Sequence, residues 1–168
     1  MVFFNTFVQL KYIEMNNNDI IRRLRFTFNI GDSEMMAIFK SGGQEVNRSE
    51  ISDWLKKDDD PEQQQLLDKQ MAVFLNGFIN NKRGKREGEQ PKPEKRLNNN
   101  IIFRKLKIAL NLKDEDILEI LMLADFRLSK HELSAFFRKP TQNQFRKCKD
   151  QVLRNFIHGL QVRYRPNN

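Results

Sequence analysis

The sequence has little of what stabilises small secreted or membrane proteins. It contains one cysteine, Cys148, so no intramolecular disulfide can form and a reducing compartment is expected. No apolar run approaches the ~20 residues that a membrane helix needs, and residues 1–15 lack the basic start and cleavage site of a signal peptide. Glycine (7) and proline (5) are sparse, and this favours helix throughout. We therefore expect a soluble, cytoplasmic, all-α protein with no membrane segment.

Residues for catalysis and metal binding are equally scarce. The two histidines, His131 and His158, and the single cysteine form no ligand spacing such as Cys-x-x-Cys or His-Glu-x-x-His. Gly42-Gly43 is a helix stop rather than a phosphate-binding loop, and Asp58–Asp60 suits capping and solvation better than cation binding. Cys148 falls on an apolar face and is expected to be a buried structural thiol. The sequence thus predicts no enzyme, no cofactor and no metal site.

An internal repeat dominates what the sequence does contain. The stretch Val46–Lys57, VNRSEISDWLKK, returns 82 positions later as Leu128–Lys139, LSKHELSAFFRK, and this spacing holds without a gap over about sixty residues. A repeat of this length indicates one supersecondary unit packed against a second copy of itself. We expect two tandem repeats of about four helices each, with helix-turn-helix-like elements, joined by a charged linker.

Caps and apolar spacing place the first two helices of each repeat. Asn17-Asn18 and Asn99-Asn100 are the predicted N-caps of the first helices, because asparagine accepts the free amide bonds at a helix start and apolar residues follow on one face. The second helices are expected over roughly Asp32–Lys40 and Asp114–Leu123. The same order of signals in both copies supports a common fold for the two repeats.

The third and fourth helices have their own start signals. Asn47–Glu50 and Ser129–Glu132 have the spacing of a capping box, in which the first side chain and the glutamate satisfy each other's backbone amides. Asp60-Pro61 is the predicted start of the fourth helix in the first copy. Gly77 and Gly159 recur inside an apolar helical pattern. A repeated glycine at such a position indicates close packing between helices.

Composition divides the chain into five segments. An N-terminal tail (1–15) precedes the first repeat (16–79), and is either a start-site extension ahead of Met15 or a segment that packs on the body. A basic linker that contains proline and glycine (80–97) leads to the second repeat (98–165) and a short tail (166–168). Because the linker combines helix breakers with dense charge, we expect it to be solvated and without regular structure.

Charge is distributed unevenly over these segments. The formal net charge is +8, but the first repeat carries 8 Lys/Arg against 11 Asp/Glu, the linker 7 against 3, and the second repeat 14 against 7. An acidic half and a basic half can attract each other, or the basic half can receive an acidic partner. The charge pattern leaves both possibilities open.

Several short motifs carry a family resemblance. They are Asn17–Ile20, Asn76-Gly77, Lys82–Lys85, Asn98–Ile101, Phe126-Arg127 and Phe145–Cys148. With these motifs and the duplicated organisation, the span Met15–Arg165 resembles the YehS-like family of uncharacterised bacterial proteins, in which a domain of unknown function is repeated in tandem. The resemblance implies a small soluble bacterial protein of two helical repeats and brings no activity, cofactor or partner with it.

Nucleic-acid binding is one function that the pattern supports. The second and third helices of each repeat resemble a helix-turn-helix, in which the later helix presents exposed residues to the major groove. In the second copy that exposed face would show Lys130, His131, Ser134, Ala135 and Arg138. In the first copy Asp53 occupies one of the same positions and would repel phosphate. Further basic residues would attract the phosphate backbone electrostatically: Lys82, Arg83, Lys85, Arg86, Arg104, Lys105, Arg146 and Lys147.

Interaction with a protein is the function that the sequence favours. Helical surfaces are ordinarily rich in Lys and Arg, and the aromatic residues here have core spacing rather than forming a stacking platform for bases. A groove between the repeats, or the acidic half against a basic partner, would serve an adaptor or a self-associating protein. We therefore expect a non-enzymatic interaction module with a protein partner or self-association, and nucleic-acid binding as the alternative.

Overall fold

The computed structural model describes residues 15–166, so the predicted tail residues 1–14 and residues 167–168 lie outside the described part. Within that part every regular element is a helix, and the all-α prediction is confirmed. The helices are α2 (Asn17–Thr27), α3 (Asp32–Gly42), α4 (Arg48–Leu55), α5 (Asp68–Arg83), α6 (Asn99–Ala109), α7 (Asp114–Leu123), α8 (Lys130–Phe136) and α9 (Asp150–Tyr164). None of the helices in residues 15–166 has the length and apolarity to cross a bilayer.

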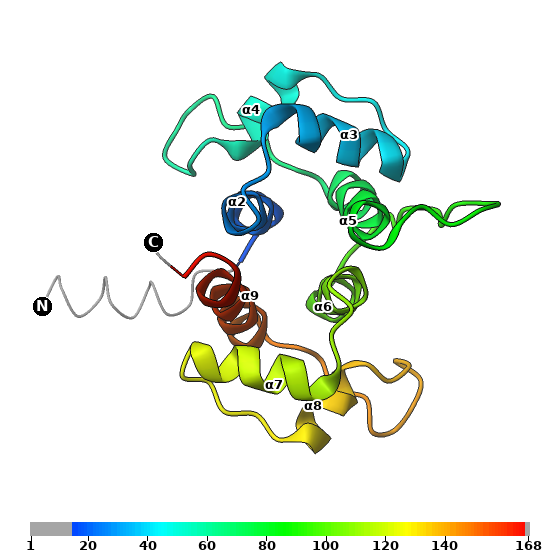
Figure 1. The fold of residues 1–168 in the computed structure, drawn as a ribbon, viewed down its shortest axis with the longest axis vertical. Helices are drawn as coiled ribbons and strands as arrows, with labels where there is room; N and C mark the ends of the chain where they lie inside the picture. The colour runs from blue at the N-terminus through cyan, green and yellow to red at the C-terminus, as the bar shows by residue number, and fades with distance from the viewer. Residues whose placement is uncertain (1–14, 167–168) are drawn as a thin grey trace, which may run out of the picture.

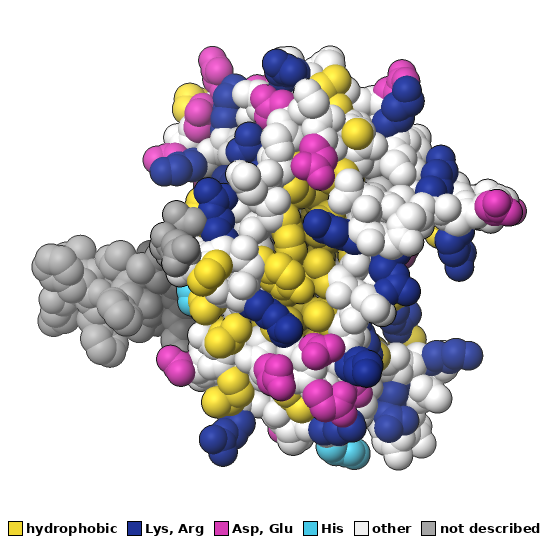
Figure 2. All heavy atoms as spheres, in the orientation of Figure 1, with side chains coloured by type: hydrophobic (Ala, Val, Ile, Leu, Met, Phe, Trp, Pro, Cys, Tyr) yellow, Lys and Arg dark blue, Asp and Glu magenta, His cyan; other side chains and the backbone are white. Residues whose placement is uncertain are grey.

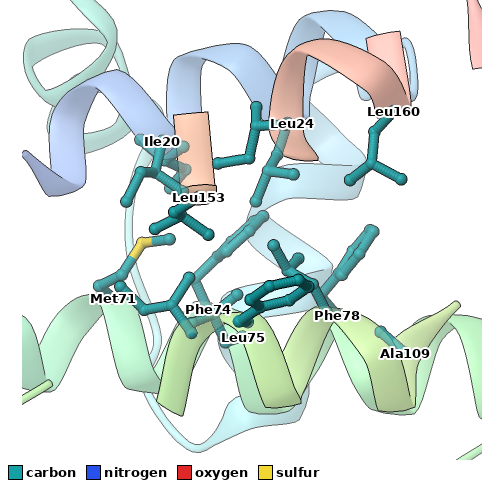
Figure 3. Close-up of a cluster of buried hydrophobic side chains, with 14 of the residues drawn as sticks. Ile20, Leu24, Met71, Phe74, Leu75, Phe78, Ala109, Leu153 and Leu160 are labelled. Carbon is teal, nitrogen blue, oxygen red and sulfur yellow. The ribbon is translucent and has the colours of Figure 1, made fainter. Parts of the chain in front are cut away.

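The two repeats fold around one shared core. Helices α2 and α5 of the first repeat and α6 and α9 of the second surround the centre, while α3 with α4 and α7 with α8 lie at opposite ends (Figure 1). Helix α5 packs against α6, and α2 packs against α9. Leu24 of α2, Phe74 and Leu75 of α5 and Leu153 of α9 are fully buried in the same interior (Figure 3). Each repeat therefore buries much of its apolar surface against the other.

A pair of crossed hydrogen bonds ties the two repeats together. The backbone N–H of Leu97, just ahead of the second repeat, donates to Oδ2 of Asp68 in the first (2.9 Å). The N–H of Met15, which occupies the equivalent place ahead of the first repeat, donates to Oδ2 of Asp150 in the second (3.3 Å). Because the bonds are exchanged in this way, the repeats are related by an approximate two-fold axis.

The first helix of each repeat is capped by the residue before the predicted cap. Asn16 Oδ1 accepts the backbone N–H of Asp19 (2.8 Å), and Asn98 Oδ1 accepts that of Ile101 (2.9 Å). The predicted caps at Asn17-Asn18, and their counterparts in the second repeat, are therefore wrong: these asparagines lie inside the helices. Their side chains are used for longer-range bonds, which the sequence signal for a cap does not distinguish.

Asn18 and Asn100 are buried and hold the segment that leads to the last helix of their repeat. Nδ2 of Asn18 donates to the carbonyl oxygens of Trp54 (2.9 Å) and Gln64 (2.8 Å), and Oδ1 accepts the N–H of Leu66 (3.0 Å). Asn100 makes the same three bonds at the equivalent positions of the second repeat. One side chain thus satisfies three backbone groups that no helix or sheet would otherwise pair.

These bonds explain why the fourth helix starts later than predicted. Helix α5 begins at Asp68 and not at Asp60-Pro61. The segment between these points is bonded to the Asn18 side chain and is therefore kept out of a helix, and Asp60 instead closes a turn in which its carbonyl accepts the N–H of Gln63 (3.1 Å). The later start of α5 has a tertiary cause, because Asn18, whose side chain holds this segment, lies in α2.

The repeated glycines lie where two helices cross at very short range, as predicted. A Cβ at Gly77 of α5 would collide with the carbonyl oxygen of Ile38 in α3, and one at Gly159 of α9 would collide with that of Ile120 in α7. Gly42 of α3 approaches the α5 backbone in the same way. The prediction of close packing is confirmed in both repeats.

The third helices start and the second helix stops as expected. Asn47 Oδ1 accepts the N–H of Glu50 (2.8 Å) and Ser129 Oγ accepts that of Glu132 (3.1 Å), and both glutamates bond back to complete capping boxes. Gly43 ends α3 in the left-handed region with φ 112°. Here the local signals were sufficient.

The linker is shorter and better anchored than predicted. Helix α5 continues to Arg83, so the first residues of the predicted linker 80–97 are helical. No helix or strand forms from residue 84 to residue 98, and most of that stretch is exposed. Its end is nevertheless held, by the Leu97 bond and by an ion pair between Glu94 and Lys105 (2.9 Å). The linker is thus a strap attached to α6 rather than a free chain.

Candidate functional site

Helix α8 offers a smaller exposed face than the sequence predicts. It spans 7 residues, and residues 124–129 separate it from α7, a connection longer than the about three to four residues of a helix-turn-helix. Ala135, predicted to be exposed, is buried. Lys130 is paired with Glu115 (2.8 Å), and this pair raises the pKa of Lys130 and lowers that of Glu115. Ser134 Oγ donates to the His131 carbonyl. Of the predicted groove-reading face, Lys130 and His131 are exposed and Ala135 is not.

The approximate two-fold axis produces two equivalent seams between the repeats, and their difference locates a candidate site. One seam lies between α2 and α9, and the other between α5 and α6. Because the sequence offset is constant at 82 positions, each residue in one seam has a counterpart in the other. The two seams can therefore be compared residue by residue.

The α2/α9 seam is neutralised by its own side chains, and the pocket that remains there is smaller, at about 440 Å³. Asp19 forms an ion pair with Arg22 (2.6 Å), which also donates to the carbonyl of Lys56 (2.8 Å). The guanidinium of Arg165 lies over the ring of Phe26, 3.9 Å from its centroid, and donates to the Phe26 carbonyl. Charge and apolar surface are thus both satisfied within the chain.

The α5/α6 seam is built from the equivalent helices, but it lacks a carboxylate and an aromatic ring at the positions of Asp19 and Phe26. Ile101 stands where the other seam has Asp19, and Ile108 stands where it has Phe26. Arg104 consequently lacks a carboxylate and keeps one long hydrogen bond, to the Phe137 carbonyl (3.4 Å). A pocket of about 730 Å³ opens here, which we call the seam pocket. It is lined by Asn76, Ile79, Asn80, Arg83, Gly84, Arg86, Gln90, Pro91, Glu94, Asn98, Asn100, Ile101, Arg104, Lys105, Ile108, Pro140 and Phe145.

Polar groups at the seam pocket are fixed in orientation and partly unpaired. Lys105, whose side chain is 11% exposed, forms the ion pair with Glu94 and donates to Oδ1 of Asn76. Because lysine can only donate, this bond fixes the Asn76 amide and leaves its buried Nδ2 without an acceptor. Gln90 donates through Nε2 to the Arg86 carbonyl (2.7 Å), and its buried Oε1 has no hydrogen-bond donor. Asn76 and Gln90 thus line the pocket, and each has one buried polar atom without a hydrogen-bond partner.

Four of the twelve predicted contact residues meet at the seam pocket: Arg83, Arg86, Arg104 and Lys105. The other eight are distributed elsewhere. Lys82 lies over the rings of Phe28 and Phe78, and Lys85 lies in the exposed linker. Lys130, His131 and Ser134 belong to α8, Arg138 follows it, and Arg146 and Lys147 lie in the α8–α9 connection.

The sequence reasoning missed the amides and isoleucines of the pocket. Asn76 and Gln90 carry the unpaired groups, and Ile101 and Ile108 create the opening. A signal for the isoleucines was present, because aligning the copies at their constant offset sets Ile101 against Asp19. Nothing in the sequence signals the amides, since their unpaired atoms follow from bonds made by other residues.

The surface in Figure 2 shows how charge surrounds this region. Hydrophobic side chains gather at the centre of the face between α2 and α9 on one side and α5 and α6 on the other. On the side from which the linker projects, Lys and Arg are the most frequent charged side chains (Figure 2). Arg83 and Arg86 form no ion pair with any described residue. The α5/α6 side is thus the receptive side for an anion.

A second cavity, of about 970 Å³, lies near the two-fold axis and has a structural explanation. It is lined in part by Asn17, Asp68, Asn99 and Asp150. Asn17 donates to Asp68 (2.8 Å), and Asn99 donates to Asp150 (2.6 Å). Its principal polar groups therefore satisfy one another across each repeat. Among residues 15–166, no three or more His, Cys, Asp or Glu side chains gather as metal ligands.

Cys148 is buried, as predicted, and this leads to a chemical prediction. Burial, with a smaller contribution from the Asp150 charge, raises the pKa of its thiol to about 12. Since the thiolate is the reactive form, we expect iodoacetamide to leave the native protein unmodified at about pH 8 and to alkylate it fully in denaturant. Mass spectrometry of both samples measures this. Alkylation of the native protein at the denatured rate would contradict the burial.

Comparison with known proteins gives a family and one relative. The model of a family described as "Protein of unknown function (DUF1456)" matches residues 17–84 and again residues 99–165. The chain is 41% identical over 150 residues to the "Uncharacterized protein YehS" of Escherichia coli (strain K12), an alignment that covers 89% of this chain and 96% of the relative. No solved structure matches the chain. The tandem matches coincide with the two structural repeats.

Proposed function

This chain belongs to the DUF1456 family of proteins of unknown function, and we propose that it acts by binding single-stranded nucleic acid rather than by catalysis. The contact surface would be the edge formed by the end of α5, the start of the linker and the outer side of α6. We call this surface the basic edge and define it by Lys82, Arg83, Lys85, Arg86 and Arg104. All five of these residues are exposed.

One observation carries the proposal: Arg83, Arg86 and Arg104 line the same opening and have no carboxylate partner among residues 15–166. The single acid that lines the opening, Glu94, is already paired with Lys105. Guanidinium groups match phosphate oxygens with two parallel hydrogen bonds, and unpaired ones attract a phosphate backbone strongly at low salt. The second repeat and the linker also hold the excess of positive charge.

The geometry favours a single strand over a duplex. Helix α8 spans only 7 residues and Ala135 on its predicted face is buried, which leaves little of it to enter a major groove. The basic edge instead borders a pocket in which Phe145 is half-buried beside Pro140. Proteins that bind single strands combine a basic groove with aromatic faces on which bases stack. A strand could thus place phosphates on the arginines and a base against Phe145.

The first test measures binding and its salt dependence. We expect a fluorescent single-stranded oligonucleotide to bind more tightly than the matching duplex, as measured by fluorescence anisotropy. If about three phosphates are contacted, the affinity should fall by a factor of roughly 20 between about 50 mM and about 200 mM salt. Equal affinity for the duplex, or affinity that does not change with salt, would contradict the proposal.

Charge reversal then locates the surface. The triple variant R83E/R86E/R104E should bind the oligonucleotide at least about 100-fold more weakly, because three phosphate contacts become repulsions. The matched control R48E/K57E/K69E changes the net charge equally at exposed residues of the first repeat. The control should retain binding within about threefold. Equal losses in both variants would show attraction by net charge alone and would overturn the site.

Association with a protein, which the sequence favours, stays a prediction. The exposed large apolar side chains include Leu67, ahead of α5, and Met122 and Leu123, at the end of α7, so they do not single out one docking face. If no oligonucleotide binds at low salt, the proposed function fails. An acidic protein would then be the next partner to test against the basic edge.

A further inference from the structure

We propose that the seam pocket binds a small phosphate ester that carries a planar polar ring, of which a nucleoside monophosphate is the simplest example. The phosphate would meet the arginines at the mouth, and the ring would enter between α5, α6 and the linker. The shared chemistry is that of a nucleotide, either free or as one unit of a strand. The inference concerns the free molecule and does not depend on strand binding.

The pocket has the size and walls for such a ligand. Its volume of about 730 Å³ falls in the range of about 300–1,000 Å³ typical of small-molecule sites. Ile79 of α5 and Ile101 and Ile108 of α6 provide apolar surface, and Pro91 of the linker and Phe145 of the α8–α9 connection complete the walls. A flat ring can be held between such walls while its polar edge stays available for hydrogen bonds.

The unpaired polar atoms specify what the ring must carry. Nδ2 of Asn76 is a buried donor without an acceptor, and Oε1 of Gln90 is a buried acceptor without a donor. Both residues line the pocket, and Asn76 itself is only 6% exposed. Buried polar groups in folded proteins are normally hydrogen-bonded, and an exception calls for an explanation. A ring with an acceptor and a donor on its edge, as nucleobases have, would pair with both once the two amides turn toward the pocket.

The charge balance specifies an anion. Four cationic side chains line the pocket against one carboxylate, that of Glu94. Oε1 of Glu94 lies 2.9 Å from Nζ of Lys105, in an ion pair that does not have hydrogen-bond geometry. Glu94 belongs to the linker and thus serves as an internal anion at a site with excess positive charge. A phosphate group would supply the negative charge that the remaining arginines lack.

The other seam provides an internal comparison. Between α2 and α9 the acid and the aromatic ring come from the chain itself, as Asp19 and Phe26. Between α5 and α6 both positions hold isoleucine. The α2/α9 seam therefore carries an anion and a flat ring in its own sequence. The α5/α6 seam carries neither at the equivalent positions. This difference supports a ligand with an anionic group and a flat ring at the α5/α6 seam.

The first experiment titrates the full-length protein with ligand and measures binding by isothermal titration calorimetry. The probes are adenosine, guanosine, cytidine and uridine monophosphates, with adenosine and inorganic phosphate as partial ligands. At least one monophosphate should bind with a Kd of roughly 10–100 μM, and each partial ligand at least about tenfold more weakly. Absence of binding by all four monophosphates, or equal binding of inorganic phosphate, would overturn the inference.

Two substitutions assign the binding to the pocket. Ile108→Trp fills the opening at a position that is 46% exposed, and should weaken the monophosphate at least about tenfold. The matched control is Phe26→Trp, at the equivalent position of the other seam with 40% exposure, and should leave binding within about twofold. Equal effects of the two substitutions would place the ligand elsewhere and overturn the inference.

Glu94→Gln gives a second, opposite readout. Removing the internal carboxylate frees Lys105 from its ion pair, so the monophosphate should bind about three to ten times more tightly. Unchanged or weaker binding would contradict the role of Glu94 as the internal anion. The outcomes also separate the two proposals: monophosphate binding without strand binding refutes only the proposed function, and strand binding without monophosphate binding refutes only this inference.

Discussion

Replacement of Gly77 by alanine is expected to destabilise the protein by more than about 3 kcal/mol, at or beyond the upper end of the usual cost of overpacking. The added Cβ would overlap the carbonyl oxygen of Ile38, a backbone atom that cannot rotate away. Helix α3 would have to move off α5, and the core that both helices enclose would open. Thermal and urea denaturation followed by circular dichroism measure the loss. Gly159→Ala should have a comparable effect at Ile120 in the second repeat.

Gly31→Ala is the matched control for these glycine substitutions. It makes the same chemical change at a glycine with nothing within 4 Å of the added atom and an ordinary φ of −78°. We expect its stability to stay within about 1 kcal/mol of the unsubstituted protein. If Gly77→Ala were as mild as Gly31→Ala, the close approach of α3 and α5 would be refuted.

Replacement of Asn18 by alanine is the second substitution with a large expected effect. It removes the partners of three backbone groups, the carbonyls of Trp54 and Gln64 and the N–H of Leu66. Asn18 is 2% exposed, so water cannot replace its amide without rearrangement. Since each buried group left unpaired costs about 1–3 kcal/mol and three are affected, we expect a total loss of at least about 3 kcal/mol. The melting temperature should fall by roughly 10 °C.

Asn16→Ala separates this loss from that of an ordinary helix cap. Asn16 is exposed and bonds the N–H of Asp19 at the start of the same helix. Its replacement should cost only about 1 kcal/mol, the typical value for an N-cap. Equal costs at Asn16 and Asn18 would mean that the segment before α5 does not depend on the Asn18 side chain. Asn100→Ala, with the same bonds in the second repeat, provides an independent repetition.

Local signals were sufficient for the third helices and for the end of α3. The capping box at Ser129–Glu132 and the helix stop at Gly43 each involve residues a few positions apart, and both were predicted correctly. The start of α5 was mispredicted because Asp60-Pro61 has every local feature of a helix start. The side chain of Asn18 keeps this segment out of a helix by bonding Gln64 and Leu66, which lie 46 and 48 positions further along the chain. Buried hydrogen bonds outweigh a local preference of about 1 kcal/mol.

The candidate site was only partly predictable for the same reason. The search for basic residues placed Arg83, Arg86, Arg104 and Lys105 among the twelve predicted contact residues. It could not show that these four line the same pocket. That grouping depends on α5 packing against α6, whereas the bases of α8 and of the α8–α9 connection lie on other elements. Ala135 was expected at the surface and is buried, because helical periodicity is ambiguous over a helix of 7 residues.

The sequence by itself determined that this protein is helical and duplicated, where most of its helices lie, and that Gly77 and Gly159 are points of close approach. Periodicity and caps carry that information because they act over one or two turns. Only the tertiary structure decided that the repeats exchange contacts about a two-fold axis and that the pocket at the α5/α6 seam is larger than the one at the α2/α9 seam. An apolar face specifies that a helix must be covered but not which helix covers it, and that choice depends on the packing of the whole chain.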